Sequence, residues 1–508
     1  MGSPILGADN SGHKAKMKDL KQRALRGGFA KMCAQAANYA LRIGSLMVMA
    51  RLLNPRDFGL VGMVTAFTGV LSLFRDFGLS AATVQRVDIT EHQMSTLFWI
   101  NLLVGAGLSL LTAAVAPIAV AFYHEPHLFW VTIAVGSSFL FNSAGVQHSA
   151  LLQRQMRFTA LATIDVISWA GSTLIGISLA LAGFGYWALV GAAVSLPVVG
   201  TLCMWFATRW IPGRPRKGIG LRSMMRFGGG LTLTGLIVYV AYNFEKVLLG
   251  RFWGAEAVGL YGRAYQLSTM PTDNLNAAVG EVAFSALSRV RDDPPRFRSY
   301  FLKAYALVLA MTIPITIAVA LFSPELIAVL LGPKWKDTAP IFRLLSPTIL
   351  IFALINPIGW LIFSLGMVGR SLRVALVLAP LVICGYIIGL PYGPKGVALA
   401  YSTAMALWVV PHIAWGLHGT VVSLRDIAVV ASKPFASGIV AGAIAFGARL
   451  ILPKFLSPLP QLVVESAILA VVYLGMLLFV MGQKHFYVDL LRGFRKPTPV
   501  EEQALAST

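Results

Sequence analysis

Four polar or charged residues lie inside long apolar runs of this sequence. Arg42 lies in the stretch NYALRIGSL, and Asn243, Glu245 and Lys246 lie in VAYNFEKVLLG. An arginine at the centre of a membrane helix costs about 2.5–3.5 kcal/mol on insertion scales. Its planar guanidinium can bind a phosphate through two parallel hydrogen bonds, which the point charge of lysine cannot reproduce. These residues predict an anion-binding site inside a bundle of helices.

Further polar residues extend this predicted cavity. Asn38 lies one helical turn before Arg42 on the same face. Pro271 lies in MPTDNLNAAVGE, where it frees a backbone carbonyl that needs cavity water or a neighbour, so we expect a bend there. The alternative for Arg42 is that it extends to the outer interface or pairs with a structural acid. The predicted substrate-binding residues are Arg42, Lys246, Asn38, Asn243, Asn274 and Asn276.

Two acidic residues are candidates for binding a coupling ion, Glu245 and Asp273. A carboxylate enclosed by apolar helices is costly when charged, so it can take up and release a proton. An ion pair with a neighbouring helix is the alternative for Glu245, which is adjacent to Lys246 but does not share its helix face.

Five charged residues are candidates for gates, because they lie at the predicted ends of helices. Three are at the outer turns and two close the inner end of the second helix: Arg51, Arg251, Arg263, Arg75 and Asp76. Interfacial anchoring or helix capping is the alternative for each. Asp165 and Glu281 are interpreted as interfacial.

The sequence predicts neither a metal site nor a cofactor. Cys33, Cys203 and Cys384 are widely spaced in apolar runs, and the histidines form no metal-binding pair. There is no glycine-rich nucleotide loop, which argues against an ATP-driven exporter. H⁺ or Na⁺ are candidate coupling ions, and the membrane potential is the alternative driving force.

The composition places these residues in a membrane protein. The chain has 508 residues, of which 57% are hydrophobic and 12% charged, against about 25% charged in soluble proteins. Its mean hydropathy is +0.72. The net charge of +21 comes from clusters of Lys and Arg between apolar runs, which is typical of the positive-inside rule rather than of nucleic-acid binding. Contact with anionic membrane lipids is consistent with these clusters.

Apolar runs predict an all-α polytopic membrane protein with about 14 transmembrane helices, since about 20 residues span the hydrocarbon core. Alternate assignment of loops puts most Lys and Arg on the side of the N-terminus, so both termini are expected in the cytoplasm. Residues 1–28 are polar and basic and do not resemble a cleaved signal peptide. The predicted spans are 29–50, 57–80, 95–121, 128–149, 160–182, 185–207, 226–249, 258–284, 300–322, 341–364, 371–390, 395–417, 434–452 and 462–482.

A repeat indicates two similar lobes. ARLLNPRDFGLVG at 50–62 matches GRFWGAEAVGLYG at 250–262, and both are predicted to join two helices. Six crossings return a chain to its starting side, so the lobes share one orientation. Two unrelated hairpins with similar turns are the alternative. The predicted domains are a basic cytoplasmic arm (1–28), an N-terminal six-helix lobe (29–208), a basic cytoplasmic linker (209–225), a C-terminal six-helix lobe (226–417), two extra helices (418–482) and a cytoplasmic tail (483–508).

The stretches RLLNPRDFGL, FRDFGLSAATVQR, TLFWINLL and LLQRQMRF resemble the Wzx-type polysaccharide flippases, in the branch of the colanic-acid and succinoglycan exporters. These belong to the multidrug/oligosaccharidyl-lipid/polysaccharide superfamily. The resemblance implies a MATE-like fold in the bacterial inner membrane. It also implies an undecaprenyl-pyrophosphate-linked oligosaccharide substrate, and partners such as a polysaccharide polymerase and a chain-length regulator.

Three other functions remain as alternatives. A MATE-like drug or metabolite antiporter shares the fold, although an exporter of cationic drugs needs acidic walls. A lipid II flippase also needs a basic cavity. A polytopic glycan polymerase or ligase needs a sizeable outer loop, and the longest one predicted here covers residues 323–340. The sequence therefore favours a transporter over an enzyme.

Overall fold

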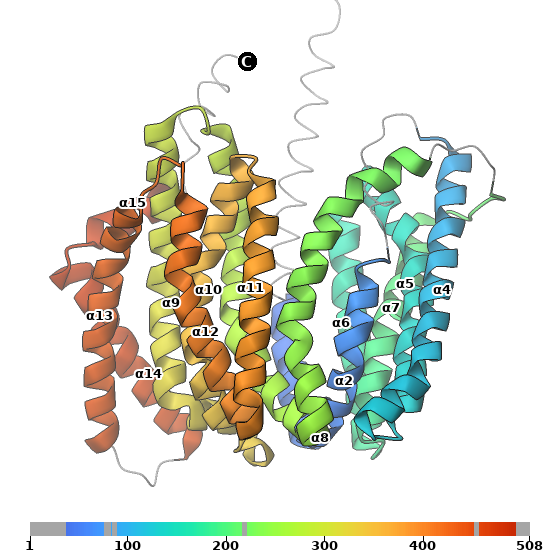
Figure 1. Ribbon diagram of the computed structural model, residues 1–508, viewed down its shortest axis with the longest axis horizontal. Helices are drawn as coiled ribbons and strands as arrows, with labels where there is room; N and C mark the ends of the chain where they lie inside the picture. Colours follow the sequence, from blue (N-terminus) through green and yellow to red (C-terminus); the bar gives the residue numbers. More distant parts are fainter. Residues whose placement is uncertain (1–36, 76–82, 84–88, 216–220, 452–456, 494–508) are drawn as a thin grey trace, which may run out of the picture. The chain divides into compact units, whose positions relative to one another are not determined.

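The computed structural model describes residues 37–75, 83, 89–215, 221–451 and 457–493 (Figure 1). Asp76, the predicted arm 1–28 and the end of the tail lie outside these residues. The chain divides into two compact units, Met1–Leu236 and Ile237–Thr508. Within the described residues all regular structure is helical, as the apolar runs predict.

Unit 1 is built from antiparallel neighbours along the chain. Helix α5 packs on both α4 and α7, while α6 packs on α7 and α2 lies against α5 and α7 (Figure 1). The elements are a helix over residues 37–52, α2 (Pro55–Ser72), α4 (Glu91–Tyr123), α5 (Leu128–Arg154), α6 (Phe158–Leu181), α7 (Tyr186–Thr208) and the first part of α8 (Leu221–Arg289).

Unit 2 begins within α8, and its other helices pack in two groups that both contact α9. Helix α10 packs on α9 and α12, and α11 packs on α12. Helices α13 and α14 pack on each other and on α9. The helices are α9 (Pro294–Leu330), α10 (Thr338–Ser364), α11 (Val368–Gly389), α12 (Gly393–Leu417), α13 (Leu424–Ile451), α14 (Pro458–Gly475) and α15 (Lys484–Gly493), with short turns η1 (Pro333–Trp335), η2 (Leu390–Tyr392) and the π-helical η3 (Met476–Val480).

The repeated phrase forms a turn in both units. In unit 1, Asn54 has extended dihedrals and caps α2, with Pro55 as the first helical residue and the Asn54 amide donating to the Asp57 carboxylate at 2.9 Å. In unit 2, α8 breaks at Gly254, where φ is 81° and ψ is −178°. Asn54 and Gly254 are aligned by the repeat. A positive φ costs glycine little, which explains this residue at the second turn.

Nine helices among the described residues are long and apolar enough to span a membrane. One of these segments, Gly369–Leu417, contains both α11 and α12. The count of fourteen stays a prediction, since three predicted spans (29–50, 57–80 and 434–452) extend into residues outside the described part. The chain is a multi-pass membrane protein.

Two expectations about helix breaks differ from the structure. Part of the predicted outer loop 323–340 is helical, because α9 continues through Pro324 to Leu330 after a break at Phe322 (φ −111°, ψ 21°). Proline is tolerated in the first turn after such a break, where its missing N–H is not needed. At Pro271, α8 keeps helical dihedrals, and its break is at Gly254 instead.

An arginine on α13 stabilises the break in α9. The Arg449 guanidinium forms an ion pair with Glu325 (Nη2 to Oε1, 2.6 Å) and donates to the Leu321 carbonyl. It also lies over the Phe322 ring, 5.9 Å from its centroid. The two side chains are only 22% and 11% exposed, so this pair is weakly screened by solvent.

We expect Arg449→Ala to lower the stability of the protein by about 2 kcal/mol, because it leaves Glu325 and a broken helix end without their donor. Arg449→Lys should show a smaller loss. The measurement is the melting temperature of detergent-solubilised protein, with the exposed Arg343→Ala on α10 as control. Equal melting temperatures for wild type and Arg449→Ala would contradict this role.

Candidate functional site

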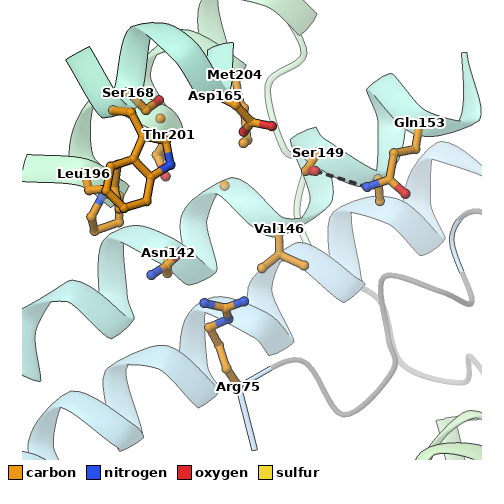
Figure 2. Close-up of a pocket in the computed structure, with 15 residues that line it drawn as sticks. Arg75, Asn142, Val146, Ser149, Gln153, Asp165, Ser168, Leu196, Thr201 and Met204 are labelled. Carbon is orange, nitrogen blue, oxygen red and sulfur yellow. Dashed lines mark hydrogen bonds between the residues drawn. The ribbon is translucent and has the colours of Figure 1, made fainter. Parts of the chain in front are cut away.

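A cavity of about 340 Å³ lies within unit 1, at the lower end of the range of small-ligand pockets, about 300–1,000 Å³. It is lined by residues of α5, α6, α7 and the turn after α2 (Figure 2). Its lining residues are Arg75, Asn142, Gly145, Val146, Ser149, Ala150, Gln153, Asp165, Ser168, Trp169, Leu196, Pro197, Gly200, Thr201 and Met204.

Glycines let the three helices approach closely around this cavity. A Cβ at Gly145 would lie 2.7 Å from the Thr201 hydroxyl, and one at Gly200 would lie 3.1 Å from the Ser168 hydroxyl. Small residues of this kind are typical of helix contacts inside membranes. Thr201 donates to the Phe141 carbonyl (2.7 Å) and thereby ties α7 to α5. Its oxygen retains acceptor capacity toward the cavity.

Helix α5 presents a polar stripe to the cavity. Asn142, Val146, Ser149 and Gln153 follow one another at steps of three or four residues, which places them on one helix face. The Gln153 amide donates to the Ser149 hydroxyl at 3.3 Å (Figure 2). The amides and hydroxyls of this wall can donate and accept hydrogen bonds with a polar ligand.

One cation and one anion line the same cavity. Figure 2 shows the Arg75 guanidinium pointing toward Asn142 and Val146, with Asp165 on the opposite side of the pocket. The Arg75 Nε is buried and has no hydrogen-bond partner among the described residues. Buried polar atoms in native structures nearly always have a hydrogen-bond partner. An acceptor on a ligand in the cavity would be such a partner for the Arg75 Nε.

Arg42 is connected to this cavity through an aromatic ring. Its guanidinium carbon lies over the Trp169 ring, 5.0 Å from the centroid, and Trp169 lines the cavity. Such a cation–π contact contributes about 0.5–1 kcal/mol at exposed sites. The structure therefore brings Arg42 and Arg75, both predicted from the sequence, to one region of unit 1. Asn38, one turn before Arg42, has a buried Oδ1 with no partner in the described part of the chain.

The predicted residues of α8 lie in unit 2 and are engaged locally. The Lys246 ammonium donates to Asn243 (2.6 Å), and the Asn243 amide donates to the Tyr239 carbonyl (2.9 Å). Arg263 donates to Gln266. Arg51 and Arg251 are exposed beside the two repeated turns.

The remaining candidates on α8 do not line the unit 1 cavity. Asn274 donates to the Met270 carbonyl (2.5 Å) and Asn276 accepts from the Trp360 indole (2.8 Å). The second contact joins α8 to α10, which gives Asn276 a packing role in this structure. Asp273 is exposed.

Glu245 occupies an unusual environment. It is fully buried, and neither carboxylate oxygen has a hydrogen-bond partner among the described residues. Aromatic contacts connect the tyrosines around it: Tyr265 with Tyr401 (6.0 Å between centroids) and Tyr386 with Tyr401 (5.3 Å). Glu245 interacts electrostatically with Tyr265 and Tyr386. An isolated charge at such a position would be costly.

Sequence reasoning missed the polar walls of α5 and α7 and the role of Trp169. Asp165 was interpreted as interfacial, yet it lines the cavity. The spacing of Asn142, Ser149 and Gln153 was the available signal. This spacing does not identify a cavity by itself, because single polar residues in apolar runs also occur at ordinary helix contacts.

This chain is similar in sequence to proteins of polysaccharide biosynthesis. Residues 48–340 match the family described as polysaccharide biosynthesis protein. The teichuronic acid biosynthesis protein TuaB of Bacillus subtilis (strain 168) is 29% identical over 57% of this chain and 61% of its own length. The lipopolysaccharide biosynthesis protein WzxC of Escherichia coli (strain K12) is 25% identical over 70% of this chain and 72% of its own. The matched part of the chain thus spans less than two thirds of TuaB.

Solved structures establish the fold. The lipid II flippase MurJ in an inward closed conformation has a TM-score of 0.71 at 15% identity, over 91% of this chain and 99% of its own. A multidrug resistance MATE transporter in an inward-facing conformation has a TM-score of 0.61 at 15% identity, over 78% and 96%. Both confirm the predicted MATE-like fold. Since the matched family segment covers more than half of the sequence, the chain belongs to the polysaccharide biosynthesis protein family, and the predicted resemblance to the polysaccharide flippases is confirmed.

Proposed function

We propose that the protein is a flippase that moves an undecaprenyl-pyrophosphate-linked oligosaccharide from the inner to the outer leaflet of the bacterial inner membrane. The observation that carries this proposal is the polar cavity of unit 1, with Arg75 in its wall and Arg42 stacked on its Trp169. Apolar helices do not keep such groups without a polar ligand, water or a partner. The names of the relatives TuaB and WzxC agree with a glycan substrate.

The isoprenoid tail, the pyrophosphate and the glycan of such a substrate each need a different environment. The isoprenoid tail can stay in lipid, whereas the pyrophosphate needs cations and the glycan needs hydrogen-bonding groups. Arg42 is our principal candidate for the pyrophosphate, because a guanidinium binds phosphate oxygens in pairs. Lys246 is the corresponding candidate in unit 2.

Alternating access is the proposed mechanism. MATE transporters of this fold have been solved in inward-facing and outward-facing conformations, which supports two accessible states for this chain. We expect both termini to lie in the cytoplasm, since Lys and Arg concentrate on that side. The flipped repeat unit would then pass to a polysaccharide polymerase and a chain-length regulator.

We propose that Glu245 binds the coupling ion. Its carboxylate is fully buried, with no hydrogen-bond partner recorded for either oxygen in the part of the chain that the structure describes, and a buried carboxylate is costly unless it is protonated or paired with a cation. The surrounding tyrosine hydroxyls can accept or donate as the occupancy changes. Asp273 is the second candidate, with H⁺ and Na⁺ as the two ions to be tested.

We expect Arg42→Ala to lower polysaccharide export by about tenfold or more, since one charge-assisted contact to the substrate contributes about 1.5–3 kcal/mol. Arg42→Lys should retain part of the activity because it keeps the charge. Export is measured in cells lacking the gene, with protein levels matched and Arg343→Ala as control. Full export by Arg42→Ala removes this residue from the mechanism.

Glu245→Gln should abolish the dependence of transport on an ion gradient, because an amide cannot exchange a proton or neutralise a cation. Transport of the lipid-linked oligosaccharide is measured in proteoliposomes with an imposed pH or sodium gradient. The matched control is Glu465→Gln, a buried glutamate on α14 whose Oε1 accepts from Gln461 (3.0 Å). A Glu245→Gln variant that still responds to either gradient would contradict the assignment.

A further inference from the structure

We propose that the cavity of unit 1 is a subsite for one neutral sugar ring of the head group. Trp169 serves as its apolar platform, and Asp165, Asn142 and Arg75 hydrogen-bond its hydroxyls. The inference rests on the proposed function and deepens it, because it separates recognition of the sugar from binding of the pyrophosphate.

The lining matches the two surfaces of a pyranose ring. Such a ring has C–H groups on its faces, which pack on the electron-rich face of an aromatic ring. Its edge carries hydroxyls that donate and accept at once. Trp169 offers the aromatic surface, while Asn142, Gln153 and Asp165 offer planar acceptors and donors along the same cavity. The volume of about 340 Å³ is that of a small-ligand site.

The charges argue against the other parts of the substrate. A pyrophosphate carries about two negative charges, and the Asp165 carboxylate in the wall would repel it. An isoprenoid tail would leave Arg75, Asp165 and the amides without partners, which costs free energy for each group. A neutral polyol satisfies both charges, since hydroxyls donate to Asp165 and accept from Arg75.

Arg42 contacts the platform directly. Its guanidinium lies over the Trp169 ring at 5.0 Å, so one side chain contacts both the ring and, in the proposed mechanism, the pyrophosphate. A sugar beside Trp169 and a phosphate on Arg42 would then be neighbours, as they are in a lipid-linked glycan. The orphaned Arg75 Nε finds its acceptor on the sugar edge.

The test compares two probes with purified full-length protein in lipid nanodiscs. One is undecaprenyl diphosphate without sugar, and the other is the lipid-linked oligosaccharide extracted from cells that lack the gene. The variants are Asp165→Asn, which keeps the side-chain shape, Trp169→Ala and the conservative Trp169→Phe. Matched controls are Glu91→Gln in the exposed first turn of α4 and Trp130→Ala, whose side chain on α5 is 64% exposed.

We expect Asp165→Asn and Trp169→Ala to bind the sugar-bearing lipid about tenfold more weakly, as for loss of a charge-assisted hydrogen bond or a stacking platform. Their affinity for undecaprenyl diphosphate should be unchanged. Trp169→Phe should retain most of the affinity for the sugar-bearing lipid, and it carries the test if Trp169→Ala does not fold.

Two results would overturn the subsite. Equal weakening of both probes would mean that the cavity contacts the phosphates, and unchanged binding of both would mean that the head group does not enter it. A wild-type protein that binds neither probe would contradict the proposed function itself, which is a different outcome from either of these.

Discussion

The cost of keeping a charged side chain among apolar helices is the constraint on which this structure depends. Arg42 offsets that cost by stacking on Trp169, and Arg75 does so by facing a polar cavity. Arg42 is exposed, whereas the buried Nε of Arg75 has no hydrogen-bond partner among the described residues. A polar substrate that enters the bundle would supply the missing acceptors.

The helices of unit 1 pack closely around this cavity. Gly145 and Gly200 let α5 and α6 approach α7 so closely that a Cβ would meet the hydroxyls of Thr201 and Ser168. Close backbone approach allows polar residues of three helices to line one pocket. In unit 2, by contrast, Glu245 is fully buried, and Tyr265 and Tyr401 form an aromatic contact.

The sequence predicts features that depend on local patterns. Apolar runs predicted the helices, and the repeated phrase predicted the turns at Asn54 and Gly254, since turn chemistry is encoded within a few residues. A predicted span ends at residue 322, where the break lies, but the sequence does not predict that α9 resumes at once, supported by Arg449 from a helix more than one hundred residues away. The cavity was also missed, because it exists only when α5, α6 and α7 face one another.

The proposed function is that this bundle moves a lipid-linked glycan. The most direct measurement is flipping in proteoliposomes that contain the purified protein and a fluorescent lipid-linked oligosaccharide, with accessibility read by an added glycosidase. The account predicts that wild-type protein exposes the inner pool faster than protein-free vesicles do, and that Arg75→Ala slows this exposure. Equal rates for wild-type and protein-free vesicles would contradict it.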